Sequence, residues 1–312
     1  MGATEVSIAR SLLLAAARSE GLAGLMRRRR FVGRAVRRFM PGEDLADALD
    51  AARRFAASGL GTVLTRLGEN VTALAEADAV ARHYRGALDE IGRARVPALI
   101  SVKLTQLGLD VDPAACERAV RSLAERAGAG GSTLWIDMED SRYTEATLQL
   151  YRRLRADRLD VGVCLQAYLR RTPADLAALL PLQPAIRLVK GAYAEPPAAA
   201  FPRKRDVDAA YWALADRLLA AAARGEARPV FGTHDMQLVA GIRARAVALA
   251  VPRGRCEYHM LFGIRERDQH ALVREGEVVR VLISYGSAWF AWYMRRLAER
   301  PANVWFVIRN LV

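Results

Sequence analysis

Eight short apolar runs recur along the chain, and a stretch with helical spacing follows each of them. The runs lie at 62–68, 97–108, 132–139, 161–168, 185–193, 229–235, 256–263 and 278–286. Helical patterns such as TEATLQLYRRLRA and TPADLAALLPL separate them. Apolar, β-branched runs of this kind suit parallel strands that are buried on both faces. Eight such units within residues 61–312 predict an α/β fold with a closed (βα)8 barrel, and an open doubly wound sheet is the alternative.

The first 60 residues lack this alternation and read as helices. The segment LADALDAARRF has helical apolar spacing, and PGED before it is typical of a helix start. We therefore predict an N-terminal helical arm at 1–60 and a barrel at 61–312. The basic stretch MRRRRFVGRAVRRF has two interpretations. It could pack its apolar stripe on the protein, which we favour, or it could contact a membrane surface.

The chain of 312 residues carries a net charge of +13. Such a charge can serve nucleic acid or an anionic membrane. The arginines are scattered through the helical patterns, however, and no helix-turn-helix or zinc-finger spacing is recognised, so we expect no nucleic-acid partner. Cys116, Cys164 and Cys256 are far apart, which argues against a disulfide framework or a zinc site and fits a reducing cytoplasm. No apolar segment is long enough to span a bilayer.

Polar side chains gather at the carboxyl ends of the predicted strands. In a (βα)8 barrel that end and the loops after it carry the reactive groups. The residues that fall there are Lys103, Asp137, Glu139, Gln166, Arg187, Lys190, His234 and Tyr285. Cations are frequent in this set and nucleophiles are few. The pattern predicts a site that binds an anion and leaves the difficult chemistry to a cofactor.

Several familiar site motifs are missing from the sequence. No HExxH or paired-histidine spacing indicates a metal site, and no GxSxG elbow indicates a serine hydrolase. The glycine-rich segment GAGG at 128–131 precedes a strand instead of opening a helix, so it does not fit a dinucleotide fingerprint. A bound nucleotide would therefore use a barrel site and not a Rossmann site.

Seven segments, in chain order, resemble the successive motifs of bacterial monofunctional proline dehydrogenases. They are ISVKLTQLGLD, IDMEDSRYTEATLQLYRRLR, VGVCLQAYLRRTPADL, RLVKGAYAEP, GTHD, EYHMLFGIR and SYGSAWFAWYMRRLAERPANVWFVIRNL. The resemblance extends from about residue 40 to the last residue. It implies a distorted (βα)8 barrel with non-covalent FAD at its C-terminal face. A rival flavin barrel, such as one similar to methylenetetrahydrofolate reductase, should lack the paired arginines of the last segment.

The resemblance also implies a reaction and its partners. L-Proline would be oxidised to Δ1-pyrroline-5-carboxylate by hydride transfer from its C5 to N5 of FAD. The electrons would pass to a membrane quinone, which is the reason to consider a peripheral contact at the inner face of the membrane. A pyrroline-5-carboxylate dehydrogenase would act on the product downstream.

Individual residues take roles from the same resemblance. Those matched to the substrate are Lys103, Arg295 and Arg296 as the carboxylate clamp, Glu299 as the partner of the clamp, and Tyr193, Tyr285 and Trp292 around the ring. Asp137 matches the active-site aspartate, whose role in orienting the clamp or handling the amine proton stays open. Arg187 matches the arginine beside flavin N5. Those matched to FAD contacts are Met138, Gln166, Arg187, Lys190, Gly191, Ala192, Thr233 and His234.

Three positions depart from the pattern of the family. Trp292 stands where tyrosine is usual, His259 where glutamine is common, and Ser284 where proline is usual. Tryptophan is bulkier than tyrosine and lacks its hydroxyl, so we expect the range of substrates to depend on Trp292. None of the three changes removes a predicted catalytic group.

Overall fold

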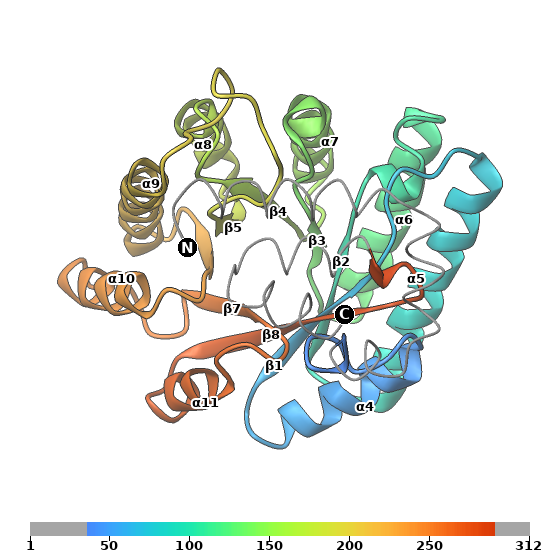
Figure 1. Cartoon of the computed structure of the whole chain (residues 1–312), viewed down its shortest axis with the longest axis horizontal. Helices are drawn as coiled ribbons and strands as arrows, with labels where there is room; N and C mark the ends of the chain where they lie inside the picture. Colours follow the sequence, from blue (N-terminus) through green and yellow to red (C-terminus); the bar gives the residue numbers. More distant parts are fainter. Residues whose placement is uncertain (1–35, 291–312) are drawn as a thin grey trace, which may run out of the picture.

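A closed barrel of eight parallel strands forms the centre of the molecule. The computed structural model describes residues 36–290, and the structural statements below concern that part of the chain. The strands are β1 (Gly61–Arg66), β2 (Ala98–Val102), β3 (Leu134–Ile136), β4 (Val161–Gln166), β5 (Ala185–Val189), β6 (Arg228–Gly232), β7 (Glu257–Leu261) and β8 (Val278–Tyr285). Each strand pairs with the next, and β1 pairs with β8 to close the barrel (Figure 1). The predicted (βα)8 barrel is confirmed, and the open-sheet alternative is wrong.

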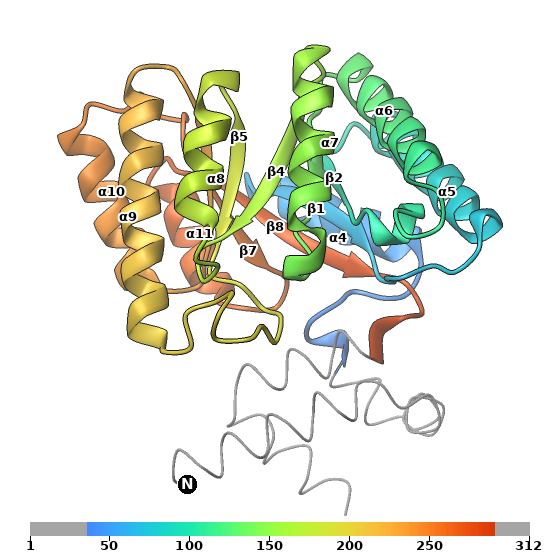
Figure 2. The same cartoon turned by 90° about the horizontal axis from the view of Figure 1, so that it is seen from above.

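Helices surround the barrel and connect its strands. They are α5 (Leu74–Ala94), α6 (Pro113–Ala129), α7 (Thr144–Ala156), α8 (Thr172–Leu179), α9 (Lys204–Ala223), α10 (Met236–Ala248) and α11 (Glu266–Arg274), which follow β1 to β7 in turn. Figure 1 and Figure 2 show them on the outside of the strands. Within residues 36–290, no helix is both long and apolar enough to cross a bilayer.

Local sequence explains where these helices begin. Asp112 precedes α6, and its carboxylate accepts hydrogen bonds from the backbone N–H groups of Ala114 and Ala115 at 2.9 and 3.0 Å. Pro113 occupies the first position of the helix, where its missing N–H costs nothing. Asp235 caps α10 in the same way. Because each cap fixes the point at which a loop becomes a helix, it also fixes the loop that leaves the preceding strand.

One helix of the predicted N-terminal arm packs onto the barrel. α4 (Leu45–Ala56) lies against β1 and β8. Its buried residues Ala48, Leu49, Ala51 and Ala52 join the hydrophobic cluster that includes the strands. Most of the basic stretch at 26–39 lies outside the described residues. The division of the chain at residue 60 stays a prediction.

The interior of the barrel is more polar than a packing core requires. Strand register places Cys164 beside Arg187 and Gly232 beside His259. Below them, toward the amino ends of the strands, Arg280 Nε donates to Glu257 Oε2 at 2.7 Å. Buried charges are costly unless they are paired. This ion pair therefore lets charged groups lie at the axis, beneath the site described next.

Candidate active site

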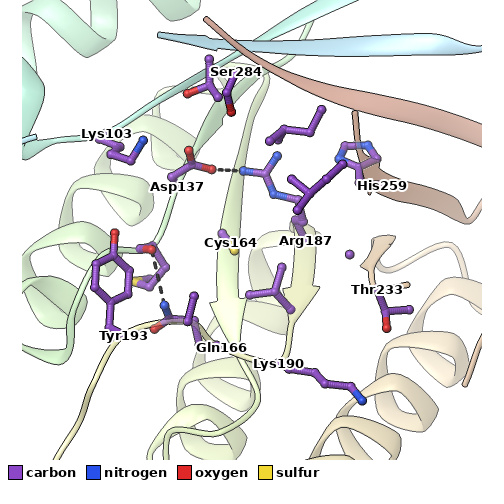
Figure 3. A pocket seen from close by; sticks show the side chains of 18 of the residues that line it. Lys103, Asp137, Cys164, Gln166, Arg187, Lys190, Tyr193, Thr233, His259 and Ser284 are labelled. Atoms are coloured by element: carbon purple, nitrogen blue, oxygen red, sulfur yellow. Dashed lines mark hydrogen bonds and ion pairs between the residues drawn. The ribbon is translucent and has the colours of Figure 1, made fainter. Parts of the chain in front are cut away.

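A cavity of about 430 Å³ lies at the carboxyl ends of the strands. Every strand of the barrel, or the residue just after it, contributes to its wall. Predicted site residues on the wall are Lys103, Asp137, Met138, Gln166, Arg187, Lys190, Gly191, Ala192, Tyr193, Thr233 and His234. Figure 3 shows several of these side chains pointing toward one another across the cavity. The fold thus brings together residues that are up to 131 positions apart in the sequence, from Lys103 to His234.

An ion pair between the buried Arg187 and the half-buried Asp137 organises one side of the cavity. Arg187 is only 3% exposed, and its Nη2 donates to Asp137 Oδ1 and to Ser101 Oγ, the latter at 2.9 Å. The hydroxyl of Ser101 donates in turn to Asp137 Oδ1 at 2.8 Å. The guanidinium carbon lies 5.0 Å from the centre of the Trp135 ring, which is close enough for a cation–π contact. The guanidinium is therefore held on two sides.

Four buried polar atoms of the wall lack a hydrogen-bond partner within residues 36–290, namely Thr65 Oγ1, Gln166 Oε1, Arg187 Nη1 and His259 Nδ1. Arg187 Nη1 is a donor and Gln166 Oε1 an acceptor. Gln166 is fixed at its other end, because its Nε2 donates to the Met138 carbonyl at 3.5 Å. Leaving buried polar atoms unpaired is costly. A ligand that presents both an acceptor and an N–H donor, as a flavin ring does, would satisfy Arg187 Nη1 and Gln166 Oε1.

The backbone after β5 approaches the cavity at a glycine. Gly191 has φ +117°, and a Cβ there would lie 2.2 Å from the Tyr168 ring. No other residue fits without moving that ring, because both the conformation and the space exclude a side chain. Ala192 and Tyr193 continue the wall. The glycine therefore lets this segment pack against Tyr168 while its backbone lines the cavity.

The ammonium group of Lys190 is held by two carboxylates. Its Nζ donates to Asp208 at 2.5 Å and to Asp235 at 3.0 Å. Burial opposes ionisation of Asp235, but the hydrogen bond and charge of Lys190 outweigh it and lower the pKa of this carboxyl. Lys190 lies on the wall as predicted, yet its charge is directed toward α9 and α10.

The segment after β6 supplies Thr233 and His234. Thr233 Oγ1 accepts from the Asp235 N–H at 3.1 Å, and His234 Nε2 accepts from the Leu261 N–H at 2.9 Å. Because Nε2 accepts, a neutral His234 carries its proton on Nδ1. The two contacts fix the orientation of both side chains.

The predicted substrate residues divide into three groups. Lys103 and Tyr193 lie on the wall of the cavity. Tyr285 does not: it is 1% exposed, and its hydroxyl forms a 2.9 Å hydrogen bond with His83 Nε2 on α5. Its neighbour Ser284 lines the cavity instead. Successive side chains of a strand point to opposite faces, so Tyr285 faces outward. The predicted residues Trp292, Arg295, Arg296 and Glu299 lie outside the described residues.

Other wall residues carry no prediction from the sequence, among them Thr65 and Cys164. His259 and Ser284, which also line the wall, were noted only as departures from the family. Burial lowers the pKa of His259 to about 4, even though Glu257 lies 3.5 Å from its Nε2. Burial disfavours the charged form of Cys164 too, and it therefore raises the pKa of this thiol. Cys164 could have been found from the sequence, because it lies two residues before Gln166 and therefore on the same face of β4.

Glu139, which the sequence places at the same end of the barrel, has a different position. It is 3% exposed and accepts hydrogen bonds from Thr105 N at 3.0 Å and Thr105 Oγ1 at 2.5 Å. Burial raises the pKa of its carboxyl, against the effect of these hydrogen bonds. Glu139 therefore joins the segments after β2 and β3, next to the cavity and not on its wall.

The fold and the cavity define a (βα)8-barrel protein with a ligand site, rich in cations, at the carboxyl ends of its strands. The sequence model of the proline dehydrogenase family matches residues 48–309. The chain is 35% identical over 277 residues to proline dehydrogenase 1 of Bacillus subtilis strain 168, which covers 89% of this chain and 90% of the relative. It is 33% identical over 280 residues to a proline dehydrogenase of Deinococcus radiodurans, covering 88% and 89%. The chain belongs to the proline dehydrogenase family, which confirms the resemblance.

Solved structures of larger proteins share the fold. Proline utilization A of Bdellovibrio bacteriovorus superposes with a TM-score of 0.79 at 22% identity, over 85% of this chain and 32% of that chain. A mutant of proline utilization A from Bradyrhizobium japonicum gives a TM-score of 0.75 at 25% identity, over 87% and 31%. This chain therefore spans about a third of the length of those proteins.

Proposed function

We propose that this chain oxidises L-proline to Δ1-pyrroline-5-carboxylate, the first step of proline catabolism, with FAD held at the carboxyl ends of the barrel strands. Membership of the proline dehydrogenase family supports the reaction. The single observation that carries the site is the buried Arg187 guanidinium, fixed by Asp137 and Ser101, with Nη1 left unpaired at the wall of the cavity.

The residues of the wall fit a flavin by their hydrogen-bonding character. Arg187 Nη1 offers a donor and Gln166 Oε1 an acceptor. Gly191 lines the cavity with its backbone, because the Tyr168 ring occupies the space that a side chain would need. Met138, Lys190, Ala192, Thr233 and His234 complete the proposed FAD-binding set. When bound, the flavin supplies the acceptor for the hydride that leaves C5 of proline.

Arg187 and Asp137 act as a unit in this proposal. A cation fixed at the wall stabilises negative charge that develops on a ligand beside it, and it needs no reorganisation during the reaction. Asp137 keeps the guanidinium in that orientation through the hydrogen bond to Nη2. The contacts of Asp137 orient Arg187, since Arg187 and Ser101 both donate to its Oδ1. They favour neither of the two roles that the sequence leaves open, which are orienting the clamp and handling the amine proton.

The substrate carboxylate needs cations in a desolvated place. Lys103 reaches the cavity from the end of β2. We propose that it binds the proline carboxylate together with Arg295 and Arg296, with Glu299 as partner of the arginines and with Tyr193 and Trp292 near the ring. Arginine offers a forked set of donors and lysine a point charge, so the three together can surround a carboxylate. Fixing the carboxylate also fixes the position of C5.

The spectrum of the flavin tests this proposal. The purified protein should be yellow, and L-proline added under anaerobic conditions should bleach it, whereas D-proline at the same concentration should not. Re-oxidation of the bleached protein by a soluble quinone under the same conditions would support the proposed quinone acceptor. A colourless protein that stays inert after FAD is added would refute the proposal.

The proposed partners outside the site have tests of their own. Co-sedimentation with liposomes, with and without anionic lipid, tests the peripheral membrane contact. A direct binding assay with pyrroline-5-carboxylate dehydrogenase tests the downstream partner.

A further inference from the structure

The chain between β5 and α9 passes the carboxyl end of β4 before it reaches its helix. We call residues 190–201 the strap. Tyr168 N donates to the Lys190 carbonyl at 2.9 Å, and Phe201 N donates to the Tyr168 carbonyl at 2.8 Å. An antiparallel bridge joins Leu169 to Ala200. Both ends of the strap are therefore fixed to the segment that follows β4.

The middle of the strap is fixed elsewhere, by the carboxylate of Glu195. Its Oε1 accepts a hydrogen bond from the Ser141 N–H at 2.7 Å, and its Oε2 accepts one from Ser141 Oγ at 2.5 Å. Ser141 begins the short helix η2 (Ser141–Tyr143), which follows β3. Hydrogen bonds to an ionised carboxylate are shorter and stronger than neutral ones. A residue that follows β5 is thereby anchored to the segment after β3, across the end of β4.

This anchor lies between two parts of the proposed site. Tyr193, two residues before Glu195, lines the cavity, and Figure 3 shows it on the same side as Lys103. Ser141 lies four residues after Asp137. Arg187 and Asp137 are held by the strands and by each other, whereas Tyr193 stands on the strap. The position of Tyr193 therefore depends on contacts that the strands do not supply.

We propose that Glu195 is a positioning residue, which through Ser141 holds the strap so that Tyr193 closes the cavity over the substrate ring. This inference rests on the proposed function. Loss of the anchor should weaken the binding of proline, because Tyr193 must then be ordered when the substrate binds. It should leave the chemical step nearly unchanged, because the groups beside the reacting atoms are held independently.

Two variants at one position separate geometry from charge. Glu195→Ala removes both hydrogen bonds. Glu195→Gln can keep both, since the amide oxygen can accept from the Ser141 N–H and the amide nitrogen can donate to Ser141 Oγ. Steady-state turnover of the flavin-loaded, full-length enzyme is then measured with a soluble electron acceptor. We expect E195A to raise KM for L-proline about tenfold, as for the loss of charge-assisted hydrogen bonds, with kcat changed less than about twofold. E195Q should stay within about threefold of the wild-type KM.

A matched control and a second variant complete the experiment. Glu226→Ala removes another carboxylate, one that bonds the exposed Arg224 before β6, away from the cavity. It should change neither KM nor kcat. Ser141→Ala removes one of the two bonds and should raise KM about threefold, and adding it to E195A should raise KM no further than E195A alone. If E195A fails to fold, Ser141→Ala carries the test.

The outcomes separate the inference from the function on which it rests. A wild-type enzyme that L-proline does not reduce refutes the proposed function. If the wild type turns over but E195A has the KM of the Glu226→Ala control, the positioning role is wrong while the function stands. A lower melting temperature with an unchanged KM means that Glu195 supports the fold only, which also overturns the inference.

Discussion

Replacing Asp137 by asparagine tests whether the ion pair at the centre of the site is as buried as the structure indicates. The substitution keeps the shape of the side chain and an oxygen that can accept hydrogen bonds. It removes the negative charge opposite Arg187, whose side chain is 4% exposed. The guanidinium would then keep the Ser101 hydroxyl and the Trp135 ring as its neighbours.

The expected loss of stability follows from this burial. Breaking a buried ion pair by neutralising one partner typically costs about 3–5 kcal/mol, because the other charge stays buried without compensation. The side chain of Asp137 is 20% exposed, and asparagine preserves a neutral hydrogen bond, so we expect the lower end of that range, about 3 kcal/mol. At roughly 2–4 °C for each kcal/mol, the melting temperature should fall by roughly 6–12 °C.

The assay compares this variant with an exposed ion pair of the same chemistry. Asp216 pairs with Arg245 at 2.5 Å, and the side chains are 39% and 41% exposed. Exposed pairs contribute about 0–1 kcal/mol, so Asp216→Asn should lower the melting temperature by at most about 4 °C. Thermal unfolding followed by circular dichroism at pH 7, at one fixed FAD concentration, measures both variants. If Asp137→Asn melts no lower than Asp216→Asn, the burial argument for the Arg187–Asp137 pair is refuted.

Two further predictions concern the substrate and the pH dependence. Lys103→Met should raise KM for L-proline by about 10–100-fold, because the bound substrate carboxylate loses a charged donor. Steady-state kinetics at matched flavin content measure this effect, and an unchanged KM would contradict the role of Lys103 in the clamp. Burial lowers the pKa of His259 from 6.5 to about 4, so the unfolded chain binds a proton that the native protein does not take up between these two values. Stability is therefore complete above about pH 6.5 and falls as the pH drops toward 4, by at most about 1.4 kcal/mol for each pH unit. The melting temperature of His259→Gln should fall less steeply than that of the wild type between pH 7 and pH 5. Parallel plots of melting temperature against pH would refute the assignment of this pH dependence to His259.

The barrel could be predicted because its signal is local and repeated. Eight apolar runs with helical spacing between them allow few architectures, and buried parallel strands account for runs without alternation. The end of the barrel that carries the site could be predicted for the same reason. Lys103, Asp137, Gln166 and Arg187 lie near the carboxyl ends of their strands, and such ends meet at one face of a barrel.

The direction of individual side chains needed the closed barrel. The sequence places Tyr285 at the end of a strand, but the pairing of β1 with β8 sets Ser284 inward and Tyr285 outward, against His83. Lys190 follows β5 as expected, yet carboxylates from α9 and from the start of α10 hold its ammonium. Which face of a strand points inward, and which helix supplies a partner, depends on register and packing between distant segments.

By itself, the sequence determined the architecture, the end of the barrel that carries the site and the family to which the chain belongs. Only the tertiary structure decided which polar and charged groups of the site pair with one another. It paired Arg187 with Asp137 and Ser101, left Arg187 Nη1 and Gln166 Oε1 unpaired within the described residues, and anchored Glu195 on Ser141. The physical reason is that periodicity is a property of neighbours along the chain. Hydrogen bonds and burial arise between residues that closure of the barrel brings together.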